Sequence, residues 1–247
     1  GDGFTVIMDY YRDSEDGQAQ ADLNRLMDGT FSNQETGMPE GTVHSELLRR
    51  PGKLYVLASH FHPDHFNKEV LQWREQRPDI IYIFSKDILR HRRAQKEDAV
   101  WLKKGEEYKD ETLSVRAFGS TDVGVSFLLQ ASGKKIFHAG DLNNWHWMDE
   151  STEAEWKGAE KNFLHELDDL YAYTPEVDVA MFPVDPRLGK EYMRGAGQFV
   201  TKIKTHIFVP MHFTPEYAKA NAFRDFAEAH GVRFVSLTHR GQKIEIE

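Results

Sequence analysis

The sequence predicts an α/β fold of four layers, in which two β-sheets are sandwiched between outer helices. Strands dominate the first half of the chain, whereas strands and helices alternate after residue 150, and both patterns fit two sheets covered by helices. Metal-ligating side chains follow directly behind several of the expected strands. The 247 residues contain no internal repeat, low-complexity tract or clear linker, so we expect one domain spanning residues 1–247.

The first half of the chain is expected to consist mainly of strands. Short apolar runs such as Leu54-Tyr55-Val56-Leu57 have the composition of buried strands. Residues 11–42 are polar and rich in Gly, Asp and Gln, with a weakly helical piece at 21–27, and a connection this long indicates a functional loop. In chain order we expect strands at 4–9, 54–57, 80–84, 112–118, 125–130 and 135–138, and helices at 67–76 and from about residue 86.

The second half opens with a long helix at 152–173, which begins in the capping box Thr152-x-x-Glu155. Gly231 is the expected terminator of the last helix, because glycine readily adopts a left-handed backbone. The remaining expected elements are strands at 177–183, 206–210 and 232–237 and helices near 192–203 and at 215–229.

The composition excludes several classes of protein. With 40% hydrophobic residues the chain can bury a substantial core, and without cysteine it can form neither disulfides nor thiolate metal sites. That composition suits a reducing compartment, so we expect a cytoplasmic protein. No apolar stretch approaches ~20 residues, which excludes a transmembrane helix, and Gly1-Asp2-Gly3 does not begin a signal peptide. The net charge of −9 disfavours nucleic acid as a partner, and we interpret the basic run at 90–93 as a solvated helix face.

Three imidazoles and a carboxylate are concentrated in His60-Phe61-His62-Pro63-Asp64-His65, directly after the strand at 54–57. Alternate residues of an extended chain point the same way, so His60 and His62 can reach one ion together. Asp64 and His65, beyond the turn at Pro63, can face a second ion. Zinc, iron and manganese all accept imidazole and carboxylate ligands, so the pattern predicts one or two divalent metal ions.

The pattern His60-x-His62-x-Asp64-His65 resembles the signature of the metallo-β-lactamase superfamily, whose members are mostly hydrolases with one or two metals. Two later landmarks extend the resemblance over most of the chain, and the compact build is most similar to the branch that includes the ascorbate-6-phosphate lactonases. Many relatives carry another strand ahead of the first. Only three residues precede Phe4, so we expect that strand to be absent here or the chain to be incomplete.

The two later landmarks also place single residues behind strands. In the family an aspartate in a Gly-Asp pair bridges the two metals, and Asp141, after Gly140, matches that position. The family's last ligand is a histidine at the end of a late strand, which His212 matches and for which His239 is a weaker competitor.

One ligand of the family pattern is missing. Relatives with two complete sites carry a further histidine between the first motif and the Gly-Asp pair, but here only His91 lies between residues 65 and 138, on the basic helix and far from a suitable strand end. Three alternatives are open: Asp122 supplies an oxygen ligand, His138 turns in, or the site holds one metal. Asp122 is favoured, which implies one tightly held ion, a weaker second one, and a better fit to manganese or iron than to zinc.

The resemblance implies metal-dependent hydrolysis, in which a metal-activated hydroxide attacks a carbonyl or phosphoryl centre. We expect Asp64 to double as proton acceptor and His146 to donate a proton to the leaving group. Arg187 either holds an anionic substrate group or pairs with Asp185, and the tryptophans flanking His146 either line the pocket or pack in the core. The expected substrate is a small anionic metabolite, namely a lactone, ester or phosphodiester. A nuclease and a non-catalytic metal-binding scaffold are the alternatives; the sequence predicts no oligomeric state.

Overall fold

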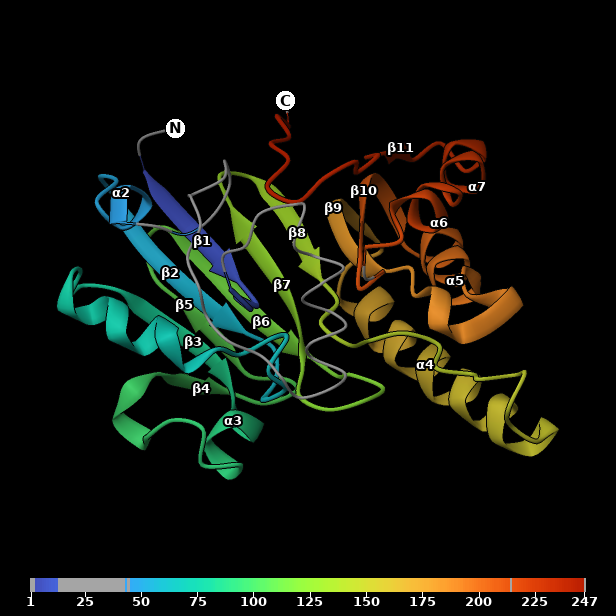
Figure 1. The fold of residues 1–247 in the computed structure, drawn as a ribbon, viewed down its shortest axis with the longest axis horizontal. Coiled ribbons are helices and arrows are strands. Elements are labelled where there is room, and N and C mark those ends of the chain that lie inside the picture. Colours follow the sequence, from blue (N-terminus) through green and yellow to red (C-terminus); the bar gives the residue numbers. More distant parts are fainter. Residues whose placement is uncertain (1–2, 13–42, 44, 214, 247) are drawn as a thin grey trace.

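Two β-sheets face each other at the centre of the computed structural model, which describes residues 3–12, 43, 45–213 and 215–246 (Figure 1). Within these residues the smaller sheet is wholly parallel, in the order β1-β2-β3-β4: Phe4–Met8, Lys53–Ala58, Ile81–Ser85 and Val100–Leu102. The larger sheet has the order β11-β10-β9-β8-β7-β6-β5. Its strands, from β5 to β11, are Glu107–Lys109, Leu113–Phe118, Ser126–Ala131, Lys134–His138, Glu176–Pro183, Lys204–Met211 and Arg233–Phe234.

Strand β2 shows how the sequence pattern builds the layers. Its side chains alternate, so that Tyr55 and Leu57 enter the core between the sheets while Leu54, Val56 and Ala58 enter the core on the outer face. An uninterrupted apolar run is therefore required, because both faces of this strand are covered.

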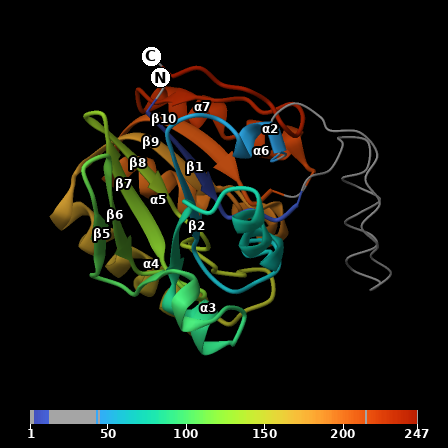
Figure 2. The same cartoon turned by 90° about the vertical axis from the view of Figure 1, so that its left-hand side faces the viewer.

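Helices cover the outer face of each sheet (Figures 1 and 2). On the smaller sheet, Val70 and Trp73 of η2 and Ile88 of α3 join the outer core. On the larger sheet, Phe163 and Phe199 are among the residues that α4 and α5 bury against the strands. The predicted four-layer αββα fold is thus confirmed. The helices of the described residues are α2 (Ser45–Leu48), η2 (Lys68–Glu75), α3 (Lys86–Arg90), η3 (Lys96–Asp98), α4 (Glu153–Tyr173), η4 (Pro186–Glu191), α5 (Arg194–Lys202), α6 (Tyr217–Asn221) and α7 (Arg224–Ala229).

The two sheets differ in width, and the difference leaves part of the larger sheet uncovered by strands. Residues of β2 and β3 pack against β6 and β7. On β9, β10 and the segment after β11, Val179, Ile207 and Val235 form a separate small core with Leu237 and Ile244 of the C-terminal segment. The inner face of β9 and β10 therefore lies beyond the edge strand β1 of the smaller sheet.

The direction of the strands brings distant loops to one edge of the sandwich. Strands β8, β9 and β10 are parallel, and β6 runs in the same direction because two antiparallel pairings separate it from β8. The carboxyl ends of β1, β2, β6, β8, β9 and β10 therefore meet at one edge, where open α/β sheets usually bind ligands.

Several expected elements differ in extent. The helix expected at 67–76 is the 3₁₀ helix η2, and the helix at 215–229 is split into α6 and α7. The strand at 232–237 shortens to β11, and the side chain of Asn221 hydrogen-bonds both main-chain polar groups of Leu237. Strands β4 and β5 were not predicted, because three residues are too few to show a periodic pattern.

Other sequence expectations stand or lie outside the described residues. The capping box at Thr152 is present, and Gly231 follows α7 with a φ of +75°. The loop expected at 11–42, with its weakly helical piece at 21–27, lies outside the described residues except at its first two positions. Among the described helices, none combines the length and the apolar character needed to cross a membrane.

Candidate metal centre

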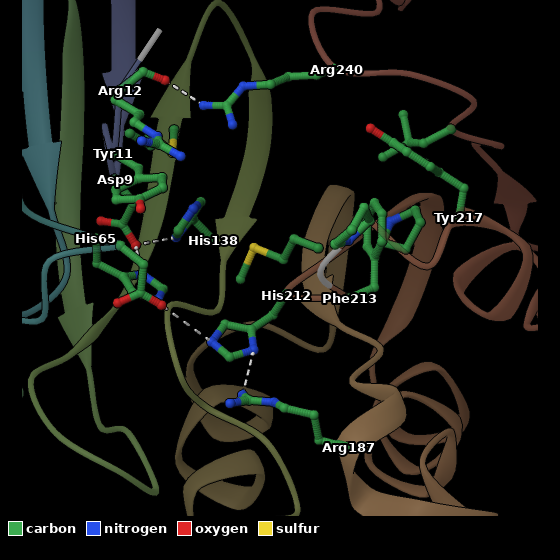
Figure 3. A pocket seen from close by; sticks show the side chains of 16 residues that line it. Asp9, Tyr11, Arg12, His65, His138, Arg187, His212, Phe213, Tyr217 and Arg240 are labelled. Atoms are coloured by element: carbon green, nitrogen blue, oxygen red, sulfur yellow. Dashed lines mark hydrogen bonds and ion pairs between the residues drawn. The ribbon is translucent and has the colours of Figure 1, made fainter. Parts of the chain in front are cut away.

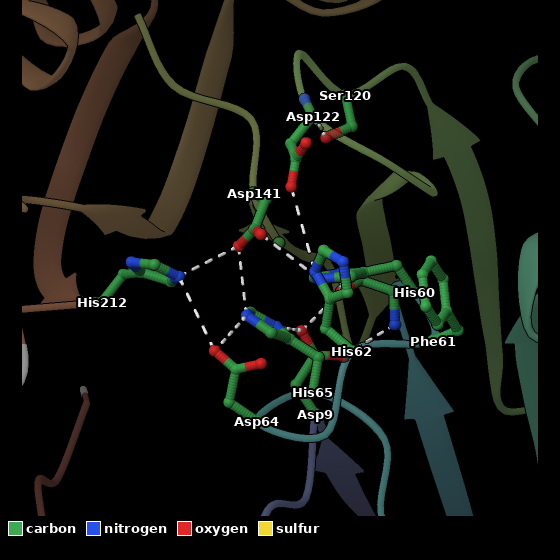
Figure 4. Close-up of polar contacts among 12 residues, drawn as sticks. Asp9, His60, Phe61, His62, Asp64, His65, Ser120, Asp122, Asp141 and His212 are labelled. Atoms are coloured by element: carbon green, nitrogen blue, oxygen red, sulfur yellow. Dashed lines mark hydrogen bonds and ion pairs between the residues drawn. The ribbon is translucent and has the colours of Figure 1, made fainter. Parts of the chain in front are cut away.

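Asp141 lies at the centre of a cluster of histidines (Figure 4). Its Oδ2 is 3.2 Å from His60 Nε2, and its Oδ1 is 3.1 Å from His65 Nε2 and 3.3 Å from His212 Nε2. These four residues follow β2, β8 and β10, so the strand ends described above bring them together.

The cluster divides into two groups of donors that share Asp141. In the first, His60 Nε2 is 3.0 Å from His62 Nδ1, which is 3.9 Å from Asp122 Oδ2. In the second, Asp64 Oδ2 is 3.5 Å from His65 Nε2 and 4.0 Å from His212 Nε2. All six predicted ligands, together with Asp122 as the favoured substitute for the missing histidine, therefore converge on two neighbouring positions. Three overlapping triads have donor atoms within 4.8 Å of one another: His60-His65-Asp141, Asp64-His65-His212 and His62-Asp122-Asp141.

The spacing of these donors fits divalent cations. Ligands bound tetrahedrally at ~2.0–2.1 Å are roughly 3.3 Å apart, and most of the nitrogen and oxygen separations lie close to that value. Asp141 Oδ1 is buried and has no hydrogen-bond partner of good geometry among the described residues, although two imidazole nitrogens face it. Groups that converge on one point without bonding each other are expected where a cation would lie between them.

Hydrogen bonds behind the cluster fix the orientation of the imidazoles. Asp9 accepts from the main-chain N of Ser59 at 2.7 Å and from its Oγ at 2.6 Å, and it contacts His65 Nδ1 at 2.7 Å. On the other side, His212 Nδ1 contacts Asp185 Oδ2 at 2.9 Å. Each carboxylate holds the Nδ1 proton, so the Nε2 lone pair of the same ring is directed at the cluster.

The electrostatics of the cluster favour positive charge. Burial would raise the pKa of Asp141, but His212, His60 and His65 hold that pKa far below its usual range. Burial would lower the pKa of His65, yet Asp141 and Asp9 outweigh it and raise the pKa to about 11. For His212, Asp141 and Asp185 likewise overcome burial and raise the pKa to about 9. A metal cation would replace the protons that these carboxylates otherwise attract.

The other histidines considered as ligands lie outside these groups. His138 is buried, its Nδ1 accepts the main-chain N–H of Gly140 at 3.2 Å, and burial lowers its pKa. His239 is exposed and bonds the neighbouring Thr238 hydroxyl. His91 lies at the end of the short helix α3, as expected, and its ring stacks on that of Phe61 with ring centres 3.7 Å apart. Its Nδ1 nevertheless faces the carbonyl of Asp87 rather than the cluster.

The structure contradicts the role expected for His146. The side chain is only 1% exposed, its Nδ1 accepts from the main-chain N of Met148 at 3.1 Å, and its Nε2 lies 3.2 Å from the carbonyl of Glu191. With both nitrogens bonded to the main chain, this ring fixes a loop and is not available as a proton donor to a leaving group.

Arg187 and Asp64 differ in how they are held. The Nε and Nη2 atoms of Arg187 bond Asp185 at 2.6–3.0 Å, so the alternative in which this arginine pairs with a structural acid is the observed one. Its guanidinium still lines a cavity beside His212. The Asp64 side chain is 51% exposed and faces the same cavity, so it is accessible to a substrate or water.

The tryptophans beside His146 pack close to the cluster. Trp145 Nε1 donates to the carbonyl of Asp141 at 2.8 Å, and its ring centre lies 5.6 Å from that of His212. Trp147 stacks on Trp145 with ring centres 6.4 Å apart. Trp145 thus supports the position of Asp141.

Two carboxylates of this centre were not identified as functional from the sequence. Asp9 directly follows the strand at 4–8, and Asp185 follows the strand that ends at Pro183. The pattern of an acid directly behind an apolar strand was present in both places. It is common in turns, however, so only the contact with a histidine distant in sequence distinguishes these residues.

The αββα sandwich and the His/Asp cluster at its strand ends define the class of metallo-β-lactamase-fold proteins. The family model described as "Beta-lactamase superfamily domain" matches residues 39–213, and the chain belongs to this family. No curated protein matches the sequence.

Solved structures share the fold at low sequence identity. A protein from Veillonella parvula described as "a possible metal-dependent hydrolase" is 11% identical with a TM-score of 0.58, and the match covers 99% of this chain and 93% of the other. Igni18, a metallo hydrolase from the archaeon Ignicoccus hospitalis, is 18% identical with a TM-score of 0.53 over 79% and 80% of the two chains. The metallo-β-lactamase fold protein YhfI from Bacillus subtilis is 12% identical, with a TM-score of 0.51 over 79% and 78%.

Proposed function

We propose that this protein is a metal-dependent hydrolase that acts on a small anionic lactone, ester or phosphodiester. The observation that carries the proposal is the convergence of His60, His62, Asp64, His65 and His212 on Asp141, with Asp122 completing the first group. Each of the two groups then offers two imidazoles, one carboxylate of its own and the shared Asp141. This donor set is richer in oxygen than a three-histidine site, so we propose manganese or iron ahead of zinc.

A bound divalent ion would lower the pKa of a water molecule and polarise the bond to be cleaved. The residues of the chain orient the ligands, accept a proton and place a positive charge at the site. Asp9 and Asp185 keep the Nε2 lone pairs of His65 and His212 directed at the centre. Asp64, exposed at the cavity beside His65, is placed to accept the proton of an attacking water. The guanidinium of Arg187 places a positive charge on the wall of the same cavity, and its ion pair with Asp185 holds it there.

The geometry favours a small-molecule hydrolase over a nuclease. The cavity beside the centre has a volume of about 600 Å³, in the range of small-ligand sites. The net charge of −9 would repel a polyanion. The narrower placement beside the ascorbate-6-phosphate lactonases, and a location in the cytoplasm, are proposals that rest on the sequence pattern and composition alone.

The proposal is tested by loading the metal-depleted protein with manganese, iron(II) or zinc, then measuring bound metal and hydrolysis together. Suitable substrates are p-nitrophenyl acetate, bis-p-nitrophenyl phosphate and simple lactones. We expect metal-dependent turnover that His62→Ala or Asp64→Ala abolishes while the fold is retained. His206→Ala is the control, since this exposed histidine lies near the start of β10, at the end opposite to His212. Turnover that is equal without metal contradicts the proposal, and tight metal binding without turnover on any substrate favours a scaffold.

A further inference from the structure

The position of Asp122 at the metal centre depends on the loop that carries it (Figure 4). Asp122 lies between β6 and β7, and its side chain is 47% exposed. Its carboxylate is 3.9 Å from His62 Nδ1, and its main-chain N is 3.4 Å from the hydroxyl of Ser120 in the same loop. Neither contact is close, so the loop itself must be held in place if this carboxylate is to serve as a ligand.

Thr121, the residue before Asp122, joins this loop to the loop that carries Asp141. Its hydroxyl accepts the main-chain N–H of Asn143 at 3.0 Å and donates to the main-chain carbonyl of the same residue at 2.5 Å. A threonine hydroxyl can accept and donate at once, whereas a valine of similar shape can do neither. Within the part of the chain that the structure describes, Thr121 makes every hydrogen bond between residues 119–124 and 139–147.

The loop that carries Asp141 is fixed from its other side by the outer helices. Asn144 in this loop is fully buried, and its Nδ2 donates to Gln198 Oε1 of α5 at 2.9 Å. Gln198 in turn donates to Glu160 of α4. The Asp141 loop is therefore attached to two helices, and the threonine hydroxyl holds the Asp122 loop against this fixed support.

The two groups of donors differ in what they face. Asp64, His65 and His212 of the second group line the cavity of about 600 Å³ (Figure 3). Neither Thr121 nor Asp122 is among the described residues that line it. A change at Thr121 therefore acts on the first group and leaves the walls of the cavity in place.

We infer that Thr121 is a positioning residue for the first group of donors and sets the affinity of the weaker second ion. Donor atoms of His62, Asp122 and Asp141 lie within 4.8 Å of one another, and the two hydrogen bonds of Thr121 keep them there. Without the hydroxyl, the N–H and the carbonyl of Asn143 lose their partner, and the loop no longer holds the Asp122 carboxylate beside the other donors. The inference rests on the proposed function only in requiring that the centre binds divalent metal.

The inference is tested by calorimetric titration of the metal-depleted protein with manganese, which needs no substrate. In Thr121→Val we expect the affinity for the weaker ion to fall about tenfold or more, which corresponds to about 1.4 kcal/mol, while the tightly held ion binds as in the native protein. Thr121→Ser keeps the hydroxyl and should retain native binding of both ions.

Thr205→Val is the matched control. Thr205 is a buried threonine near the start of β10, far along the strand from His212, and its hydroxyl donates to the carbonyl of Ile203 at 2.9 Å. Each valine variant loses a hydrogen bond to the main chain, so urea unfolding should show that both are destabilised. Only Thr121→Val should lose affinity for manganese, and far-ultraviolet circular dichroism checks that both variants are folded.

Three results would overturn the inference: an unchanged affinity for the weaker ion in Thr121→Val, an equal loss in Thr121→Ser, or an equal loss in Thr205→Val. Binding of a single ion by the native protein would overturn it as well. All four results leave the proposed function standing, because the protein still binds metal. Conversely, two bound ions without turnover on any substrate would refute the proposed function and leave the role of Thr121 intact, whereas a native protein that binds no divalent metal would refute both.

Discussion

At the scale of single residues, two of the groups that build the centre have an unusual main chain. Asp9 and His212 have positive φ angles of +47° and +60°, a left-handed conformation that residues with a Cβ seldom adopt. Each is held there by side-chain bonds, Asp9 to Ser59 and His65, and His212 to Asp185. Local strain that is offset by such contacts is typical of functional sites.

Asp122 is the residue on which the number of bound ions depends. Its Oδ2 lies 3.9 Å from His62 Nδ1, and its loop is tied to the Asp141 loop by Thr121 Oγ1, which is 2.5 Å from the carbonyl of Asn143. We expect Asp122→Ala to abolish binding of the weaker second ion and to leave the tightly held one, because the first group loses its own carboxylate. Asp122→His should keep two ions and shift the preference toward zinc. Titration of the metal-depleted variants with manganese and with zinc measures both, and two tightly held ions in Asp122→Ala would show that another residue completes the site.

At the scale of elements, close approach between loops sets the geometry of the centre. Gly124, with a φ of +74°, lies against the His60 strand end so closely that a Cβ there would collide with the carbonyl oxygen of Ser59. Gly140 is similarly placed, since its Cβ would be 2.9 Å from the side chain of Ser59 and from the carbonyl oxygen of Val125. These two glycines let the β6–β7 and β8 loops pack directly on the loop that carries the histidines.

A pair of glycine variants separates this packing from backbone strain. Gly133 has a similar φ of +76°, but a Cβ at this position would meet nothing within 4 Å, so Gly133→Ala tests only the cost of the conformation, about 1 kcal/mol. Gly124→Ala should cost about 1–3 kcal/mol more, because Ser59 and His60 must move, and it should also weaken metal binding. Urea unfolding and metal titration measure the two effects. Equal destabilisation by both variants would show that the loops can separate freely.

At the scale of the whole molecule, most of the core lies away from the metal centre. Three large apolar clusters occupy the space between the sheets and the two outer faces, and they need no ion to form. The strand ends that carry the ligands are therefore anchored independently of the metal.

Removal of the metal should leave a folded protein. We expect chelation to preserve the far-ultraviolet circular dichroism spectrum while lowering Tm, because an ion that binds only the folded state contributes about 3 kcal/mol at a hundredfold excess over its Kd. Thermal unfolding with and without added manganese measures this difference. Complete unfolding on chelation would instead assign the ions a structural role, as in small zinc domains.

The two sheets are also joined at the end opposite to the site, through Asp110. This carboxylate accepts from Tyr55 OH at 2.7 Å, from Lys53 Nζ at 2.9 Å, and from the main-chain N of Thr112 and Leu113 at 2.8 and 3.0 Å. Burial would raise the pKa of Asp110, but these bonds hold it well below its usual range. The charged form therefore stabilises the folded state at neutral pH.

Because the folded-state pKa of Asp110 is depressed, its contribution is complete above the unfolded pKa of about 3.9 and is lost as the pH falls below it. We expect Asp110→Asn to reduce the free energy of unfolding by about 2 kcal/mol at pH 7. The difference from the native protein should shrink as the pH approaches 3. Urea unfolding at several pH values measures it, and a difference that is constant with pH would contradict the role of the charge.

The fold class and the candidate ligands could be predicted from the sequence because their signals are local. Apolar runs mark β2 and β9, and His60, His62, Asp64 and His65 stand together directly behind one of them. Which side chains pair with each other, by contrast, depends on distances in the folded protein, and a local sequence pattern does not give these distances. Asp9 meets His65 from 56 positions away, His146 is bonded on both nitrogens by Met148 and Glu191, and Arg187 is held by Asp185. Even the cavity arises only from folding, since it exists because the smaller sheet ends at β1 while the larger one continues to β11. Residue types and their spacing thus limit the chemistry that is available, and the packing of strand ends decides which groups take part.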